Sequence, residues 1–214
     1  MTIAVKICGL SDEISVRAVI ESGADFVGFV HYPKSPRHVS IEKATKLKSL
    51  LPDNIKSVMV VVNPDDKLLS DIAGIMKPDF LQLHGNETPE ILTEIRKKFP
   101  KIKTIKAVSV CNLDDIKIAE NYYDIAEFLL FDAKPTNDKM MHGGNGIAFD
   151  WNILAGQKFT LPWFLSGGLN AENVAQAIKT SGTKIVDVSS GVERSAGVKD
   201  ISLINEFVKA VRAI

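Results

Sequence analysis

The chain has 214 residues, of which 26 are basic and 26 acidic, and hydrophobic residues make up 45% of it. This length and hydrophobic content exclude a disordered chain and allow a large core in one domain. The balanced charge points to neither a nucleic-acid partner nor a lipid surface, and we expect no membrane-spanning segment and no signal peptide.

The cysteine content predicts the setting of the protein. Only Cys8 and Cys111 occur, which favours a reducing, cytoplasmic location. A disulfide between them is the alternative that we do not favour. No Cys/His cluster has the spacing of a metal site, so we expect no metal, and we interpret Cys111 as structural.

Short apolar runs alternate with amphipathic stretches along the whole chain. The runs are rich in Val, Ile, Leu and Phe, as strands buried on both faces require. The expected strands cover residues 3–8, 25–30, 56–62, 79–84, 102–109, 127–132, 162–166 and 184–190. The expected helices cover residues 11–22, 40–51, 65–76, 88–98, 112–122, 150–156, 170–180 and 200–213. Expected helix caps are Ser11, Ser40, Thr88, Asn112, Asn170 and Asp200.

Eight strand–helix units in a chain of this length predict an α/β fold, a (β/α)8 TIM barrel in which residues 1–214 form a single compact domain. An open doubly wound sheet is the structural rival, but the dinucleotide-binding glycine pattern is missing after the first strand. The longest irregular stretch, 133–149, is either a functional lid or a surface loop.

The first expected strand ends in a thiol. Lys6 and Cys8 alternate with Val5 and Ile7, so they share one face of the strand. A nearby cation favours a thiolate, although a free cysteine is also often a small buried hydrophobe. The eighth strand neighbours the first in a closed barrel, so Asp187 can pair with Lys6.

Glycines follow the last two strands. Gly167-Gly168 and Ser190-Gly191 expose backbone N–H groups where a Cβ would block close approach. Barrels frequently hold a phosphate between the loops after strands 7 and 8. The two glycine pairs together therefore predict a phosphorylated ligand.

Further polar residues fall at other strand ends, where barrels carry their active sites. Asp132 follows an apolar strand and is either a catalytic acid or a loop carboxylate. Gln82 and His84 share one face of the fourth strand, above Phe80, and His84 contacts a ligand or merely caps the barrel. Arg37 lies in a proline-bounded loop without an obvious structural task and can clamp a carboxylate.

Taken in order, these motifs resemble phosphoribosylanthranilate isomerase, a small (β/α)8 barrel of tryptophan biosynthesis. The resemblance covers nearly the whole chain and departs at Asn145, where the family usually has threonine. The matching motifs are Lys6-Ile7-Cys8-Gly9-Leu10, Ser35-Pro36-Arg37, Gln82-Leu83-His84-Gly85, Phe131-Asp132-Ala133, Gly143-Gly144-Asn145-Gly146, Phe149-Asp150-Trp151, Leu165-Ser166-Gly167-Gly168-Leu169, Asp187-Val188-Ser189-Ser190-Gly191-Val192-Glu193 and Gly197-Val198-Lys199-Asp200.

The resemblance implies an Amadori rearrangement of N-(5-phospho-β-ribosyl)anthranilate to 1-(2-carboxyphenylamino)-1-deoxyribulose 5-phosphate. It implies that Asp132 is the general acid, that Cys8 is the general base and that Arg37 holds the anthranilate carboxylate. Gly167, Gly168, Ser190 and Gly191 would hold the phosphate, and Gln82, His84 and Asp187 complete the expected substrate contacts. No cofactor is implied, and the family includes monomers and homodimers.

Two other functions fit a phosphate-binding barrel. One is another sugar-phosphate isomerase or epimerase, such as the histidine-pathway isomerase, which usually relies on two aspartates, one of them where this chain has Cys8. The other is a non-catalytic barrel that binds a phosphorylated metabolite. Two titratable groups at opposed strand ends argue against the second alternative.

Overall fold

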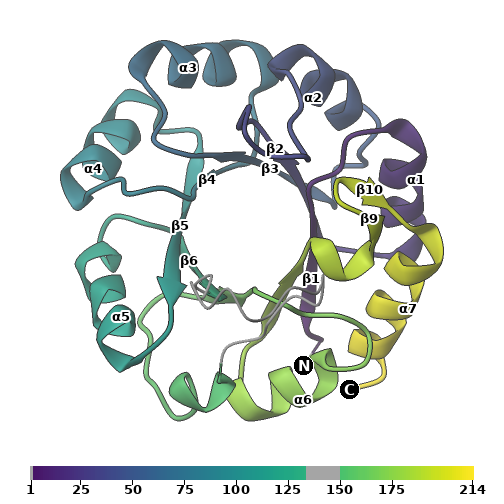
Figure 1. Ribbon diagram of the computed structural model, residues 1–214. Helices are drawn as coiled ribbons and strands as arrows, with labels where there is room; N and C mark the ends of the chain where they lie inside the picture. The colour runs from purple at the N-terminus through teal and green to yellow at the C-terminus, as the bar shows by residue number, and fades with distance from the viewer. Residues whose placement is uncertain (1, 134–149) are drawn as a thin grey trace.

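The computed structural model describes residues 2–133 and 150–214. Eight parallel strands close into a barrel in chain order, and helices surround it (Figure 1). This arrangement confirms the expected (β/α)8 fold. The expected irregular stretch lies outside the described residues, except for Ala133 at the end of the sixth strand.

The elements follow the predicted order. The barrel strands are β1 (Ala4–Cys8), β2 (Phe26–Val30), β3 (Lys56–Val61), β4 (Phe80–Leu83), β5 (Lys103–Val110), β6 (Phe128–Ala133), β7 (Trp163–Leu165) and β8 (Ile185–Val188). The α-helices are α1 (Glu13–Ser22), α2 (Ile41–Lys48), α3 (Asp66–Asp71), α4 (Pro89–Lys98), α5 (Leu113–Lys117), α6 (Val174–Ser181) and α7 (Ile201–Arg212). A short antiparallel hairpin, β9 (Glu193–Ser195) and β10 (Val198–Lys199), follows the barrel.

Three predicted helices are shorter than expected or change to another helix type along their length. The helix predicted over 65–76 becomes a π-helix, η1 (Ile72–Met76), and ends at Lys77, which precedes Pro78 and so disfavours helical backbone. The helix predicted over 112–122 continues after α5 as a 3-10 helix, η2 (Ile118–Tyr122). Only one 3-10 turn, η3 (Trp151–Ile153), forms in the range 150–156, and Gly156 follows it with a φ of 73°.

Four of the six expected helix caps are confirmed. Ser40, Thr88, Asn112 and Asp200 each accept a hydrogen bond from a backbone N–H of the first helical turn. Asp12 caps α1 in place of Ser11, because its carboxylate accepts from the N–H of Ser15. Asn170 caps the turn that precedes α6 and not the helix itself.

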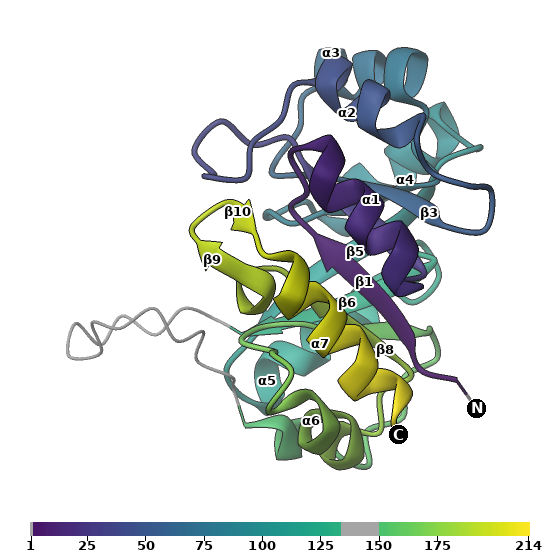
Figure 2. The ribbon, with the colours of Figure 1, turned by 90° about the vertical axis from the view of Figure 1, so that its right-hand side faces the viewer.

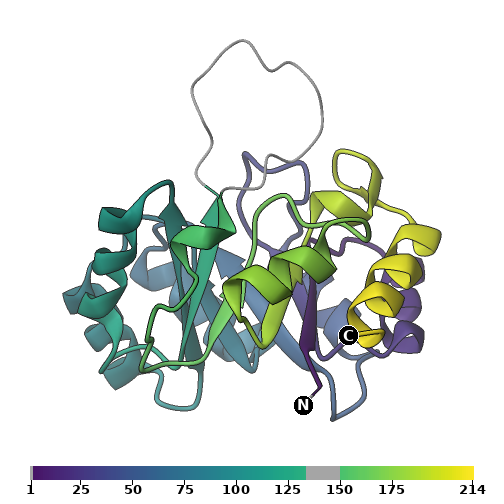
Figure 3. The same ribbon diagram turned by 90° about the horizontal axis from the view of Figure 1, so that it is seen from below.

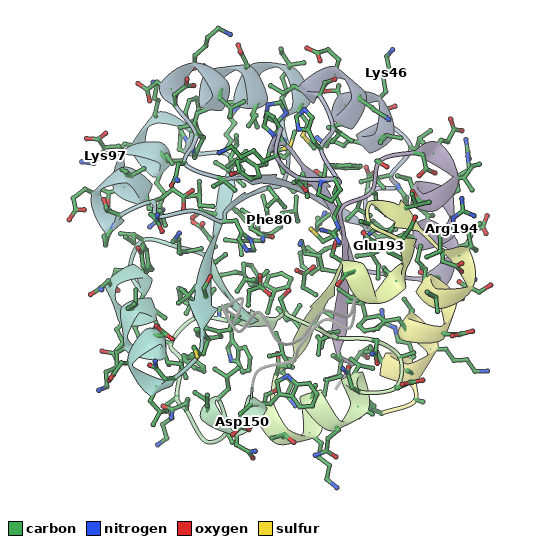
Figure 4. All side chains as sticks on the ribbon, viewed as in Figure 1. Lys46, Phe80, Lys97, Asp150, Glu193 and Arg194 are labelled. Carbon is green, nitrogen blue, oxygen red and sulfur yellow. The ribbon has the colours of Figure 1, made fainter. Side chains whose placement is uncertain are left out.

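Four phenylalanines fill the N-terminal end of the barrel. Phe26, Phe80 and Phe128 are the first residues of β2, β4 and β6, and Phe164 comes from β7. Their rings form a closed cycle with centroids 5.3–5.8 Å apart, mostly edge to face. Phe80 is labelled inside the barrel in Figure 4. This aromatic floor leaves only the opposite end of the barrel open to a ligand.

Three carboxylates stabilise the N-terminal end at every second strand. Asp25, Asp79 and Glu127 lie just before β2, β4 and β6, and each accepts a hydrogen bond from the backbone N–H of a residue near the start of the preceding strand. Both termini lie at this end as well (Figure 3). Groups at this end of a barrel serve stability and not catalysis. None of the described helices is long and apolar enough to cross a bilayer.

We expect Asp79→Asn to destabilise the fold by about 1–3 kcal/mol at pH 7. Burial raises the pKa of Asp79, but hydrogen bonds from Ser57 and the charges of Lys48 and Lys56 outweigh burial, and the net pKa is lowered. The stabilisation by Asp79 is therefore complete above the ordinary aspartate pKa and is lost as the pH falls through the lowered one. Urea unfolding at pH 7 and pH 3 should show the variant losing less stability than the wild type. Asp53→Asn, at an exposed position, is the control; an equal loss of stability in the variant and the wild type would contradict the prediction.

Candidate active site

A buried ion pair joins the first and last barrel strands. Nζ of Lys6 on β1 lies 2.9 Å from Oδ1 of Asp187 on β8, and the Lys6 side chain has no solvent exposure. Ser166, just beyond β7, donates its hydroxyl to the other carboxylate oxygen at 3.1 Å. The expected Lys6–Asp187 pair is thereby confirmed. Because both groups are fully engaged below the barrel mouth, we assign Asp187 a structural task toward Lys6.

The Cys8 thiol lies one layer above Lys6 on the same face of β1. Cys8 is 7% exposed, and a Cβ at Gly28 on β2 would come within 2.8 Å of its Sγ. Burial raises the pKa of the Cys8 thiol; Lys6 and Lys199 lower it, Asp187 raises it, and the net pKa is above the ordinary value. The predicted placement of Lys6 and Cys8 on one inward face is confirmed. The positive charges of Lys6 and Lys199 therefore offset part of the rise in the pKa of Cys8 that burial causes.

Arg37 has a structural partner that the sequence analysis did not foresee. Its Nε and Nη2 each lie 2.7 Å from a carboxylate oxygen of Glu193 on β9, in a bidentate pair. Lys199 on β10 contacts Oε1 of Glu193 at 2.7 Å, and it also donates to the carbonyl of Ser189. The expectation that Arg37 has no structural task is therefore wrong. The sequence predicts no role for Glu193, because nothing local ties the charge of Arg37 to a partner 156 residues away.

The hairpin and the Arg37 loop pack closely beside Cys8. A Cβ at Gly197, whose φ is 81°, would come within 2.4 Å of the carbonyl oxygen of Pro36. A Cβ at Gly9, whose φ is 80°, would come within 2.5 Å of Cδ of Arg37. Figures 2 and 4 show the hairpin standing at the open end of the barrel, with Glu193 on its inner side and Arg194 at the rim. Glycine at both positions therefore lets Arg37 lie directly over the end of β1.

Asp132 forms a second cluster with residues that end β4. Nε2 of His84 lies 3.2 Å from Oδ2 of Asp132, and Nδ1 of His84 lies 2.8 Å from Nε2 of Gln82. Gln82 is buried, and its Oε1 has no hydrogen-bond partner among the described residues. With the Gln82 amide donating to Nδ1, the neutral imidazole donates Nε2–H to the Asp132 carboxylate. Rotation of the amide by 180° would instead let Nδ1–H donate to Oε1 and let Nε2 accept a proton from Asp132.

The two glycine loops lie against each other. Gly167 and Gly168 have φ values of 89° and 65°, which L side chains rarely adopt. A Cβ at Gly191 would come within 1.9 Å of the carbonyl oxygen of Leu169, so the loop after β8 rests directly on the loop after β7. A 3-10 helix, η4 (Ser190–Val192), starts at this contact. The expectation that both glycine pairs meet at one place is thus consistent with the geometry.

The three groups surround the open end of the barrel. Cys8 on β1 and Asp132 on β6 stand on strands that lie well apart around the barrel (Figure 1). The glycine loops follow β7 and β8, on the arc between those two strands. A thiol, a carboxylic acid and a backbone-lined anion site can together move protons on a bound sugar phosphate. Within residues 2–133 and 150–214, no group of three His, Cys, Asp or Glu side chains can hold a metal ion.

Residues 5–210 match the protein family described as N-(5'phosphoribosyl)anthranilate (PRA) isomerase. A curated relative of that name from Paramagnetospirillum magneticum is 45% identical over 212 residues, which cover 99% of this chain and 98% of the relative. The crystal structure of the Thermotoga maritima phosphoribosyl anthranilate isomerase is similar with a TM-score of 0.89 and 38% identity, covering 100% of both chains. Another isomerase structure, in complex with reduced 1-(o-carboxyphenylamino)-1-deoxyribulose 5-phosphate, has a TM-score of 0.86 and 36% identity, also covering 100% of both chains.

We expect the rate at which iodoacetamide alkylates Cys8 to rise with pH with a midpoint above the ordinary thiol pKa of about 8.5, because burial raises the pKa of Cys8. The rate should be followed against pH in Cys111→Ser, which removes the exposed thiol. Lys199→Met should move the midpoint further up, since Lys199 lowers the pKa of Cys8. Lys97→Met, on the outer side of α4, is the matched control and should not move it. An unchanged pH midpoint in Lys199→Met would contradict this electrostatic account.

Proposed function

We propose that Cys8 is the general base of this protein and Asp132 its general acid, because the chain belongs to the N-(5'-phosphoribosyl)anthranilate isomerase family. As a member of that family, it converts N-(5-phospho-β-ribosyl)anthranilate to 1-(2-carboxyphenylamino)-1-deoxyribulose 5-phosphate in tryptophan biosynthesis. The observation that carries this assignment is the placement of one buried thiol and one carboxyl group on well-separated strands, at the end of the barrel that the phenylalanine floor leaves open. A base and an acid on opposite sides of the sugar are what an Amadori rearrangement needs.

In the first step Asp132 donates a proton to the furanose ring oxygen. The C1′–oxygen bond breaks, and the anthranilate nitrogen supplies the electron pair that forms the Schiff base. In the second step the Cys8 thiolate takes the C2′ proton, which gives an enolamine that tautomerises to the ketone. Each proton transfer is worth typically about 10²–10⁴-fold in rate. The Schiff base forms within the substrate, so no lysine adduct is needed.

The surroundings of Cys8 suit a base that must exist as a thiolate for part of the cycle. Burial favours the neutral thiol and raises the pKa of Cys8, whereas the Lys6 and Lys199 ammonium groups favour the thiolate and lower that pKa. The Asp187 carboxylate keeps Lys6 charged: burial lowers the pKa of Lys6, but Asp187 and Cys8 outweigh burial and raise it. The charge on Lys6 thus pairs β1 with Asp187 on β8 and also lowers the pKa of the Cys8 thiol.

The surroundings of Asp132 suit an acid that must alternate between two protonation states. His84 can donate Nε2–H to the carboxylate or accept the proton of the acid at the same 3.2 Å distance. The Gln82 amide can match either tautomer, because its two ends have similar shapes. We assign Gln82 and His84 to this role beside their expected contacts with substrate.

The charges of the substrate fit the remaining groups. Glu193 occupies Nε and one N–H of Nη2 of Arg37, so the Nη1 end of the guanidinium is the part that can receive the anthranilate carboxylate. The backbone of the loops at Gly167, Gly168, Ser190 and Gly191 would hold the phosphate. The phosphorylated substrate is the partner we propose, with no nucleic acid or membrane.

Three further properties belong to the proposal. Residues 1–214 act as one domain. The enzyme works in the cytoplasm, where a reducing environment keeps Cys8 as a free thiol. It is a monomer or a homodimer, and a Thermotoga maritima relative is described as dimeric.

We expect Cys8→Ala and Asp132→Asn each to lower turnover by at least about 10²-fold, because each removes one proton transfer. Folding and product binding should remain largely intact. Anthranilate fluorescence follows both turnover and product binding, and circular dichroism checks the fold. Near-wild-type turnover in either variant would remove that residue from its assigned role.

Arg37→Met should weaken binding of the product by about 10-fold or more, since a charge-assisted hydrogen bond contributes roughly 1.5–3 kcal/mol. The KM should rise more than kcat falls, because the carboxylate takes no part in the proton transfers and is bound alike in the substrate and the transition state. Arg194→Met, on the exposed outer side of the hairpin that carries Glu193, is the matched control. Equal effects of the two substitutions would contradict a specific contact.

A further inference from the structure

A second buried ion pair lies outside the barrel wall, behind the end of β4. Nζ of Lys106 on β5 is 2.7 Å from Oε2 of Glu87, and the two side chains are 4% and 1% exposed. The neighbours Ile105 and Ala107 pack in the barrel interior, so Lys106 points outward toward the helices. The pair therefore does not face the open end where the substrate binds.

The pair holds the backbone on both sides of His84. Nζ of Lys106 donates to the carbonyl oxygens of Leu83 and Gly85, at 3.4 and 2.7 Å. The carboxylate of Glu87 accepts the N–H of Gly85 at 3.0 and 3.1 Å. The N–H of His84 itself donates to the carbonyl of Val61 at 2.9 Å. The peptide groups that flank His84 therefore have little freedom to rotate.

The loop after β3 further restricts the backbone that follows His84. Glu87 also accepts the N–H of Asn63, at 2.8 Å, and Oδ1 of Asn63 accepts the N–H of Asn86. A Cβ at Gly85 would come within 2.4 Å of Oδ1 of Asn63. A buried charge pair costs free energy of desolvation unless its hydrogen bonds are all made. Here most of the hydrogen bonds of Lys106 and Glu87 go to the backbone of the turn that holds His84 and Gly85.

We propose that Glu87 and Lys106 are positioning residues for the isomerisation: from behind the barrel wall they set the backbone around His84, and through the His84 imidazole they set the orientation of Asp132. This proposal rests on the assignment of Asp132 as the general acid. Neither residue touches the substrate. A displacement of His84 by about 1 Å is enough to cost roughly 10²-fold in rate.

The test is a double-mutant cycle between Lys106→Met and His84→Ala. Alone, Lys106→Met should lower kcat about 10–100-fold and change KM less than about threefold. In the His84→Ala background it should lower kcat no further, because the group that it positions is gone. An equal loss in both backgrounds would overturn the proposal. Asp79→Asn, a carboxylate on backbone N–H groups at the opposite end of the barrel, should lower stability and leave kcat unchanged.

Lys106→Met leaves the Glu87 carboxylate buried without its cation, so the neutral variant Glu87→Gln/Lys106→Met is measured beside it. A second readout needs no turnover: the ¹⁵N shifts of the His84 imidazole, assigned with His84→Asn. We expect the balance between the two His84 tautomers to change from the wild type in either variant; an unchanged balance would overturn the proposal. Wild-type turnover in Asp132→Asn would instead show that Asp132 is not the general acid. The ¹⁵N measurement on His84 does not depend on that assignment.

Discussion

The rest of the structure depends on a lysine ammonium buried without solvent exposure at the seam of the barrel, beside Asp187. Burying such a charge costs several kcal/mol unless a counter-ion and hydrogen bonds compensate for it. Asp187 can do so only when β8 lies beside β1 in the observed register, with Lys6 opposite Asp187. The same contact fixes the height of Cys8 above the pair and puts a positive charge below the thiol. The contact that closes the barrel therefore also sets the electrostatic surroundings of Cys8, the proposed base.

The two ends of the barrel use charged groups differently. At the N-terminal end, carboxylates accept backbone N–H groups, and the phenylalanine rings exclude water. At the open end, two groups have a partner and still keep hydrogen-bonding capacity: Arg37 retains its Nη1 end beside Glu193, and His84 retains two tautomers beside Asp132. Groups of the first kind stabilise one structure, whereas groups of the second kind can change protonation or partner without moving the backbone.

Much of this could be predicted from the sequence where a local pattern determines the outcome. Strand alternation places Lys6 and Cys8 together, and adjacency of the first and last strands predicts the partner of Lys6. The pairing of Arg37 with Glu193 and of Lys106 with Glu87 could not be predicted. A charge on a loop or on the outer face of a strand has many possible partners, and packing in three dimensions selects one. The broken helices were missed for a similar reason, because the hydrophobic period does not distinguish α-, π- and 3-10 turns.

The carboxylates at the N-terminal end differ from the Lys6–Asp187 pair in how far along the chain each contact reaches. Asp25, Asp79 and Glu127 bond to residues 20, 22 and 23 positions earlier, each within one pair of consecutive strands. The Lys6–Asp187 contact spans 181 residues. Short loops close at lower entropic cost than long ones. Each strand pair can therefore acquire its own bond while the chain is still being synthesised, whereas Lys6 receives its counter-ion Asp187 only when the last strand arrives. A ribosome-bound chain that lacks β8 would already carry Lys6 and Cys8 on one strand, but it would lack the carboxylate that lets the Lys6 ammonium be buried.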